Sequence, residues 1–564
     1  MAKLRNLLMI SLIALPSYLC GQSSSCPRFV AGSVVTEPPD LYSVGGSLAV
    51  NLSYNTATDS DGRTLYCFTT PDGAESPTLH IWPGDHLIVT VKNNLPAPAS
   101  AGSMAMATNA AFICGAAMMD ASSVNVHYHG TNTSPTCHSD EVIHTLINSG
   151  ETFTYNVAFP SDEPPGLYWY HPHVHGISEP AVQGGASGAI VVEGIESLQP
   201  AVAGLPQRLL IVRDQMVAGS PTPGGNVPSW DLTLNYVPIA YPALTPALIQ
   251  APYSTTEFWR VLNASADTIL DFQVVYDGVP QELMLVALDG VPVGSQDGIH
   301  VGSLIPFTHL RLPTASRAEF IVRTPSPDVH SAQFITQSVD TGPDGDNDPQ
   351  RVLATIVGSA STESGMALPA AVAPPASHLR FSGLAAARVT AKRHLYFSEN
   401  TTQFFITVDG QTPVAFSPDN PPAIVTRQGS VEDWTIENRS QENHEFHIHQ
   451  LHFLVLSQDN FELNGSQPVN TIQGQMADMI EIPFWDGNPA HPYPSVTVRM
   501  DLRGPDTGDF VYHCHILEHE DGGMMAIIRV LPALVPLRQE ANHKPNAIGA
   551  AGLPRGASGP VGRQ

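Results

Sequence analysis

The chain has 564 residues, of which 42% are hydrophobic and only 14% are charged. Disordered chains have the opposite balance, so we expect a folded protein of three or four domains at roughly 150 residues each. The net charge of −27 argues against a nucleic-acid partner, because an acidic surface repels phosphate. The 45 glycines and 50 prolines disfavour helical bundles and suit strands joined by turns.

The first 21 residues have the features of a secretory signal peptide. Lys3 and Arg5 precede an apolar stretch at residues 7–15, which is too short to span a bilayer. No later run of uncharged apolar residues reaches the length of a membrane span, about 18 residues. We therefore expect an exported protein, periplasmic or extracellular, whose mature chain begins near residue 22 and has no membrane span.

The six cysteines fall into three groups. Cys20 lies at the end of the predicted signal peptide, and Cys514 lies between two histidines, which indicates a metal ligand. The remaining four suit two disulfides in an oxidising compartment, with three possible pairings. They are Cys26, Cys67, Cys114 and Cys137.

One strand pattern occurs three times, at residues 84–94, 255–265 and 429–440. In each copy, apolar residues alternate before an asparagine, which places the apolar side chains on one face of a strand. The asparagines are spaced by 170 and 175 residues, at Asn93, Asn263 and Asn438. A repeat of this length predicts three domains of one kind.

Other short strands, separated by turn signals, predict an all-β fold of sandwiches or barrels. They lie at residues 152–160, 208–215, 318–324 and 525–531. We place the three domains at residues 22–197, 198–385 and 386–535, followed by a flexible tail rich in Pro, Gly and Ala at residues 536–564.

Four His-x-His pairs lie towards the two ends of the chain. Residues i and i+2 of a strand point to the same face, so each pair can offer two imidazoles to one site. Two pairs fall in the first predicted domain, two in the third and none in the second: His127/His129, His171/His173, His447/His449 and His513/His515. This segregation predicts eight imidazoles that meet at an interface between the first and third domains.

A second metal site is indicated around Cys514, whose sulfur must point away from the two histidines that flank it. His519 and Met524 follow it, and His444 precedes it. Two histidines, one cysteine and a weak methionine ligand fit a blue-copper site. Zinc also accepts Cys and His, but the methionine and the eight other imidazoles favour copper. Met525 is an alternative to Met524, which has the better spacing.

Taken together, the motifs HYHG, WYHPHVHG, HEFHIHQ and HCHILEHEDGGMM resemble those of the multicopper oxidases, the laccase family of three-domain enzymes. The resemblance covers about residues 40–533, and the last motif is most similar to bacterial laccases of the spore-coat type. It implies an all-β fold of three cupredoxin-like Greek-key sandwich or barrel domains. Tyr128 stands where Trp is more usual, at a position that is not a ligand.

The resemblance also implies four copper ions, held by twelve side chains. The type 1 copper would be held by His444, Cys514, His519 and Met524. The type 2 copper would be held by His127 and His447, one type 3 copper by His129, His171 and His515, and the other by His173, His449 and His513. Four further histidines are not expected to be ligands: His138, His144, His175 and His452.

A laccase-like activity follows from this resemblance. A phenolic or similar aromatic donor would give up one electron at a time at the type 1 copper. Dioxygen would take four electrons and four protons to form two water molecules. The backbone on either side of Cys514 would connect the two copper sites. By resemblance, Glu520 would deliver protons, and Asp140 would act near the type 2 copper.

Two alternatives stay open. One is a metallo-oxidase that detoxifies cuprous or ferrous ions, and the other is a copper-binding protein without turnover. A cluster of methionines in the first domain is compatible with a soft Cu(I) site, although an apolar surface insertion is the favoured interpretation. These are Met104, Met106, Met118 and Met119.

Overall fold

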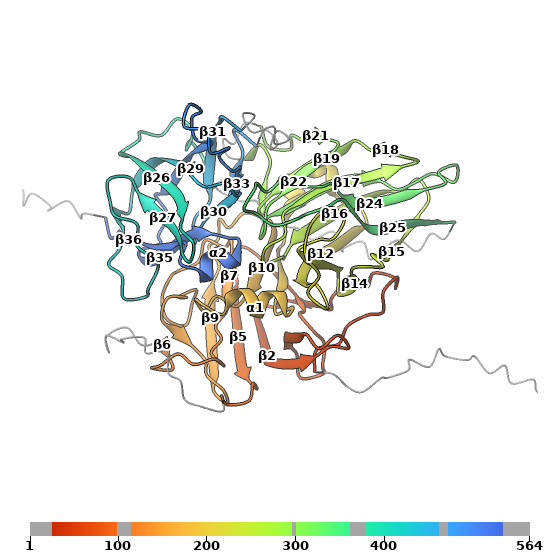
Figure 1. Cartoon of the computed structure of the whole chain (residues 1–564), viewed down its shortest axis with the longest axis horizontal. Coiled ribbons are helices and arrows are strands. Elements are labelled where there is room, and N and C mark those ends of the chain that lie inside the picture. The colour runs from red at the N-terminus through yellow and green to blue at the C-terminus, as the bar shows by residue number, and fades with distance from the viewer. Residues whose placement is uncertain (1–24, 99–113, 296–299, 361–379, 462–471, 534–564) are drawn as a thin grey trace, which may run out of the picture.

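The computed structural model describes residues 25–98, 114–295, 300–360, 380–461 and 472–533. Their regular secondary structure is almost entirely β-strand, and the strands form three pairs of sheets (Figure 1). The all-β prediction is therefore confirmed. The predicted signal peptide, the predicted tail, Met104 and Met106 lie outside the described residues.

The first pair of sheets is built from the N-terminal part of the chain, coloured red to orange in Figure 1. Its elements are β1 (Asp40–Tyr42), β2 (Ser47–Thr58), β3 (Thr64–Thr69), β4 (Thr78–Ile81), β5 (His86–Asn93), β6 (Cys114–Gly115), β7 (His127–His129), β8 (Thr145–Leu146), β9 (Thr152–Ala158), β10 (Gly166–His171), α1 (Ser178–Gln183) and β11 (Gly188–Val192). One sheet has the order β3-β2-β5-β9 and the other β1-β4-β11-β10-β7, while β6 and β8 form a separate ribbon.

The second pair follows two short 3-10 turns, η1 (Ile195–Ser197) and η2 (Pro200–Val202). Its strands are β12 (Gln207–Met216), β13 (Trp230–Leu234), β14 (Val237–Ile239), β15 (Ala247–Pro252), β16 (Thr256–Asn263), β17 (Leu270–Tyr276), β18 (Val279–Pro280), β19 (Leu283–Leu288), β20 (Val291–Pro292), β21 (Ile305–Phe307), β22 (Leu310–Leu312), β23 (Arg317–Arg323), β24 (Ala332–Thr336) and β25 (Arg351–Ser359). The larger sheet runs β14-β13-β12-β16-β23-β19-β20, and the smaller runs β15-β25-β24-β17-β18.

The third pair, cyan to blue in Figure 1, is formed by the C-terminal part of the chain. Its elements are β26 (Ala391–Glu399), β27 (Phe404–Val408), β28 (Ile424–Arg427), β29 (Ser430–Asn438), β30 (His444–Ile448), β31 (Phe453–Asp459), β32 (Met476–Ala477), β33 (Met479–Ile482), β34 (Ser495–Leu502), β35 (Gly508–Cys514), α2 (Leu517–Asp521) and β36 (Met525–Leu531). The sheets run β27-β26-β29-β34-β31-β32 and β28-β36-β35-β30-β33.

The three copies of the sequence repeat form β5, β16 and β29, which occupy equivalent places. Each lies between a parallel and an antiparallel neighbour: β2 and β9, β12 and β23, and β26 and β34. We call the three sheet pairs the first, middle and third repeats. The domain boundaries near residues 197 and 385 stay predictions.

The asparagine that ends each repeat strand makes the same contacts in all three copies, which we call the asparagine latch. Its side-chain amide donates to main-chain carbonyls of distant loops, including those of Ile147, Pro313 and Pro483. Its amide oxygen accepts the main-chain N–H two residues further on. Because Asn93, Asn263 and Asn438 are fully buried, these bonds satisfy polar groups that would otherwise cost stability.

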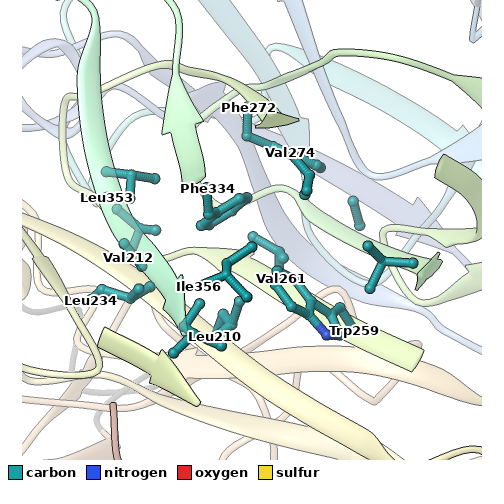
Figure 2. Packing of buried hydrophobic residues seen from close by; sticks show 14 of the residues in the cluster. Leu210, Val212, Leu234, Trp259, Val261, Phe272, Val274, Phe334, Leu353 and Ile356 are labelled. Atoms are coloured by element: carbon teal, nitrogen blue, oxygen red, sulfur yellow. The ribbon is translucent and has the colours of Figure 1, made fainter. Parts of the chain in front are cut away.

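Each repeat has its own apolar core, and the alternating apolar residues of its repeat strand contribute side chains to that core. Figure 2 shows the middle core, where Trp259 and Val261 of β16 point towards Phe334 of β24. The ring centroids of Trp259 and Phe334 are 5.9 Å apart. Val89 and Val91 of the first repeat, and Trp434 and Ile436 of the third, are buried in the corresponding cores. The predicted period-two faces are therefore confirmed.

The three repeats also pack against one another. Strands β10 and β11 are buried on both faces, because their outer face lies against the middle repeat. This contact joins Trp169 and Val191 to Ile211 and Leu262, with Met479 of the third repeat at its edge. The strands that carry the histidine pairs thus lie at a junction of all three repeats.

Two disulfides are present in the first repeat, as predicted. They join Cys26 to Cys67 and Cys114 to Cys137, which settles the pairing that the sequence left open. Cys514 is the buried free thiol of the described residues.

Candidate metal centre

The eight histidines of the four pairs lie on or directly beyond strand ends in two sheets. Strand β7 pairs with β10 so that His127 lies opposite His171, and β30 pairs with β35 so that His447 lies opposite His513. Each of the eight side chains is at most 2% exposed. Strand geometry therefore aims each pair into the protein, at the junction where β7, β10 and β35 come together (Figure 1).

The first and third repeats meet directly through these rings. His127 stacks on His449 with ring centroids 3.8 Å apart, and His129 stacks on His447 at 4.0 Å. The Nε2 atom of His513 lies 3.2 Å from Nε2 of His173 and 3.2 Å from Nε2 of His449. The structure thus brings all eight imidazoles to one place, as the segregation of the motifs predicts.

Burial keeps these imidazoles neutral, which is the form that binds metal. It lowers the pKa of His129, His447 and His515 well below 6.5, and neighbouring imidazoles add to the effect. Burial, helped by His173, lowers the pKa of His513 to about 4. A neutral ring has one N–H donor and one lone pair.

Hydrogen bonds fix which nitrogen carries the proton in four of the rings. In each, Nδ1 donates to an oxygen at 2.8–3.0 Å: His127 to Asp140, His171 to the Pro172 carbonyl, His447 to the Asp478 carbonyl and His513 to the Cys514 carbonyl. The Nε2 lone pairs of His127, His171 and His447 are buried and have no hydrogen-bond partner. A metal cluster requires imidazoles whose Nε2 lone pairs point inward and accept no hydrogen bond, while hydrogen bonds at Nδ1 fix the rings. These three histidines meet both conditions.

A second group of side chains surrounds Cys514. The Nδ1 atoms of His444 and His519 lie 3.0 Å apart, and the Cys514 sulfur lies 3.7 and 3.6 Å from them. Their Nε2 atoms face the Ser440 hydroxyl at 2.6 Å and a Glu442 carboxylate oxygen at 3.3 Å. Helix α2 returns the chain so that His519 reaches back to Cys514. Burial raises the pKa of the Cys514 thiol, so a bound cation would be needed to hold it as thiolate.

The two candidate methionines belong to different apolar clusters. Met524 is buried in the same core as Cys514, and its carbonyl accepts the Cys514 N–H at 3.0 Å. Met525 begins β36 and packs instead with Val142 and Phe416 in a separate cluster. This arrangement favours Met524 as the fourth residue of the Cys514 site.

Asp140 lies directly behind His127. Its Oδ1 atom accepts the His127 Nδ1–H at 3.0 Å and the Tyr128 N–H at 2.9 Å, and Gln450 of the third repeat donates to Oδ2 at 2.7 Å. Burial raises the pKa of Asp140 well above its usual range. The three hydrogen bonds fix the carboxyl group, so Asp140 can orient His127 directly.

Glu520 is fully buried on α2, and neither carboxylate oxygen has a hydrogen-bond partner among the described residues. Its Oε1 atom lies 3.7 Å from Nδ1 of His175. Burial alone would raise its pKa, but His173, His175 and His513 outweigh burial and lower it to about 2. Glu520 is thus a charged carboxylate buried beside the histidine cluster, in ion-pair contact with His175.

The other histidines named from the sequence lie apart from the cluster or are bonded elsewhere. His138 bonds to the Thr154 carbonyl, His144 to Glu141 and His452 to the Asp289 carbonyl. Met118 is exposed and Met119 is buried near Val174, and they cannot be related to Met104 or Met106, which lie outside the described residues.

Several buried polar residues around the cluster escaped the sequence analysis. Thr314 of the middle repeat donates to the His515 carbonyl at 2.7 Å and contacts the Glu445 carboxylate. Asp478 and Arg317 form a buried ion pair beside His129. No local pattern marks them, because each is a single polar residue in or beside a strand.

A cavity of about 500 Å³ opens beside His519. Phe404 stacks on the His519 ring there, with centroids 4.5 Å apart. Six carboxylic side chains from the middle and third repeats line it: Asp267, Asp344, Asp346, Glu399, Glu442 and Glu518. The Cys514 site is thus approached through an acidic cavity.

Comparison with known proteins finds similarity to multicopper oxidases. Two family models, both described as multicopper oxidase, match residues 116–197 and 389–533. The chain is 37% identical to a multicopper oxidase of Staphylococcus aureus over 103 residues, which are 18% of this chain and only 20% of that protein. It is 22% identical over 462 residues to the rice multicopper oxidase LPR1 homolog 1, covering 72% of this chain and 74% of that one.

Solved structures share the fold. The McoA multicopper oxidase of Aquifex aeolicus, in its 2F4 variant, superposes with a TM-score of 0.64 at 17% identity, covering 89% of this chain and 100% of that one. A multicopper oxidase of Campylobacter jejuni, described as a metallo-oxidase, superposes with a TM-score of 0.62 at 21% identity, covering 90% and 96%. The two matched segments contain the four histidine pairs and Cys514, so the parts of the chain that carry the candidate metal ligands are similar to the multicopper oxidase family.

Proposed function

We propose that this protein is a laccase-like oxidase that binds four copper ions and couples one-electron oxidation of a donor to the reduction of O2. Four donor electrons and four protons would convert one O2 to two water molecules. Bound copper supplies the one-electron redox chemistry. The observation that carries the proposal is the pair of adjacent buried groups, one of eight imidazoles and one of His444, Cys514 and His519.

The assignment of individual ligands, as the family resemblance implies it, is part of this proposal. Two sets support it most directly, since their ligand atoms lie within 4.8 Å of one another: His173, His449 and His513, and His444, Cys514 and His519. Cys514 is directly bonded in the chain to His513 on one side and to His515 on the other. The backbone therefore connects the Cys514 site to the eight-histidine group on both sides.

The protein's own residues would handle orientation and protons. Asp140 accepts the Nδ1–H of His127 and so keeps its Nε2 lone pair directed inward. Glu520, buried and without a hydrogen-bond partner, would take up protons and release them to reduced oxygen. His175 lies between Glu520 and the surface, with its side chain 24% exposed.

The acidic cavity bears on the choice of donor. Phenols remain the donors that the family resemblance implies, but the carboxylic groups beside His519 favour a cation where they are ionised, because they raise its local concentration. Burial raises the pKa of Asp267, Glu399 and Glu442, and a bound cation would oppose that shift. A cuprous or ferrous ion or a cationic arylamine would fit this field. The metallo-oxidase is therefore the second candidate function.

Metal analysis and oxygen uptake test the main proposal. Fully loaded protein is expected to be blue and to consume one O2 for every four one-electron donors oxidised. Copper-loaded protein that binds only the Cys514-site ion, or that takes up no O2 with any donor, would contradict it.

The donor class is tested by comparing kcat/KM for a neutral phenol, a cationic arylamine, Cu(I) and Fe(II) at low and high salt. Asp344→Asn/Asp346→Asn, at the cavity, should lower kcat/KM for the cations and spare the phenol. Asp409→Asn, an exposed acid whose side chain is 56% accessible and not part of the cavity lining, is the matched control. Equal effects on phenol and cations would favour the phenol oxidase.

We also propose that the protein works outside the cytoplasm, where its disulfides would persist. Support comes from the Cys26–Cys67 and Cys114–Cys137 bonds. Among the described residues, no helix has the length and apolar character needed to cross a membrane. Cell fractionation tests the location, and recovery in the cytoplasm with reduced thiols would contradict it.

A further inference from the structure

Asp478 contacts two of the eight histidines through two different atoms. Its main-chain carbonyl accepts the Nδ1–H of His447 at 2.8 Å, and its carboxylate atom Oδ1 lies 3.4 Å from Nε2 of His129. The two rings are stacked on each other. One residue between β32 and β33 therefore reaches an imidazole of the first repeat and one of the third.

The Asp478 carboxylate is held in place by Arg317 of the middle repeat. The guanidinium donates from both terminal nitrogens, to Oδ1 at 2.8 Å and to Oδ2 at 2.5 Å, and both side chains are fully buried. The Arg317 Nε–H is bonded to the Leu167 carbonyl at 3.1 Å. The Asp289 carboxylate accepts the main-chain N–H groups of Arg317 and Asp478 at 2.9 and 3.3 Å. These hydrogen bonds together hold the Asp478 carboxylate in a single orientation against Arg317.

The Arg317–Asp478 ion pair packs closely against Gly130, the residue that follows His129. Gly130 has a φ of +82°, and a Cβ atom there would lie 2.4 Å from Arg317 and 2.4 Å from Asp478. Both the backbone conformation and the lack of space require glycine. The glycine of the HYHG motif is thus explained by the ion pair.

His129 differs from the four rings whose Nδ1 atom is anchored. Its Nε2 atom lies 3.4 Å from the Asp478 carboxylate, and both ring nitrogens are buried without a hydrogen-bond partner among the described residues. A carboxylate only accepts, so it favours the tautomer that carries the proton on Nε2. The lone pair of His129 is then on Nδ1.

We propose that Asp478, clamped by Arg317, is a positioning residue that holds His129 with its Nδ1 atom towards the metal, while its carbonyl holds His447 with Nε2 towards the metal. The middle repeat, which has no histidine pair, would in this way help to build the copper cluster. This inference rests on the proposed function, since it assumes that the eight imidazoles bind copper.

Two double variants isolate the acceptor. Arg317→Met/Asp478→Asn removes both charges but keeps an oxygen for the His129 Nε2–H, whereas Arg317→Met/Asp478→Leu removes the oxygen as well. Removing both partners avoids an unpaired buried charge. The main-chain carbonyl that holds His447 is unchanged in both. Arg311→Met/Glu481→Leu is the control, because that buried pair also joins the middle and third repeats but contacts none of the eight histidines in the interactions above.

Copper per chain and the EPR-visible fraction of that copper are measured for each protein as purified and after copper loading. We expect the Leu variant to lose the spin-coupled, EPR-silent copper and to need about 10- to 100-fold more free copper to regain it. Its blue colour and the EPR-visible type 2 signal should remain. The Asn variant and the control should keep the silent pair.

Equal copper binding by the Asn and Leu variants would overturn the proposal, and so would loss of the silent pair in the Asn variant or in the control. If the Leu variant does not fold, Arg317→Met/Asp478→Ser, whose hydroxyl is too short to replace the carboxylate, gives the same comparison. A wild-type protein that binds no copper would instead contradict the proposed function.

Discussion

The Nε2 atoms of His173 and His513 lie 3.2 Å apart, although 340 residues separate them in the chain. Both rings are buried, and burial lowers the pKa of each. When both atoms carry a lone pair, which is the form that binds metal, the two nitrogens repel, and a cation between them would remove that repulsion. The contact joins the first repeat to the third, so metal binding and packing of the repeats are coupled.

Removing copper is therefore expected to destabilise the whole protein. Each site that binds only the folded state adds about 2.7 kcal/mol when free copper is 100-fold above its dissociation constant. Thermal unfolding of the chelator-treated protein should begin at a lower temperature and separate into more than one step. Adding copper should restore a single transition, and an unfolding profile that copper leaves unchanged would contradict the coupling.

Replacing Cys514 by serine should bleach the blue colour and abolish turnover with every donor. The sulfur lies within 3.7 Å of both neighbouring imidazole nitrogens, and a hydroxyl does not replace a thiolate in such a site. The EPR signal of type 2 copper should remain, because the eight histidines are untouched. Visible absorption and oxygen uptake measure both effects. Retained blue colour would exclude Cys514 from the type 1 site.

The neighbouring methionines provide a matched pair of substitutions. Met524→Leu should change the reduction potential of the blue site, since the axial thioether tunes it. Met525→Leu should leave the potential unchanged, because Met525 packs in a different cluster. Both exchanges conserve volume and should cost less than about 1.5 kcal/mol of stability. If only Met525→Leu shifted the reduction potential, Met525 and not Met524 would be the fourth residue of the Cys514 site.

Glu520→Gln should slow the reaction of the reduced protein with O2 by about 100-fold, within the range for loss of a positioned acid or base. The colour should persist, because Glu520 is not a ligand in the proposed set. Stopped-flow reoxidation isolates this step from donor oxidation. Glu518→Gln, on the same helix but in the wall of the acidic cavity, should reoxidise at the normal rate. Equal rates for all three proteins would remove the proton role.

His80 should make stability depend on pH. Burial lowers its pKa, but hydrogen bonds to Asp40 and Glu193, at 3.0 and 2.6 Å, outweigh burial and raise the pKa above 6.5. A histidine whose pKa is higher in the folded than in the unfolded state makes its full contribution to stability below about pH 6.5. That contribution is lost as the pH rises through the pKa of the folded state. The difference in unfolding free energy between wild type and His80→Gln should shrink as the pH rises. Parallel denaturation curves at every pH would contradict this.

The sequence predicted those features that follow a local period. Alternation identified β16 and β29, and the i, i+2 spacing put each histidine pair on one face of a strand. Asp478 and Arg317 could not be found in this way, because 161 residues separate the two partners and neither belongs to a motif. The acidic cavity also combines residues from Asp267 to His519, so only the packed repeats reveal it.

The asparagine latch is present in all three repeats, whereas the histidine pairs are present in two. The latch of the middle repeat, Asn263, holds loops of a repeat that carries no histidine pair. Its retention therefore reflects folding rather than redox chemistry. Asparagines at intervals of about 170 residues should consequently help to recognise this architecture in chains whose metal-binding motifs have decayed or been replaced.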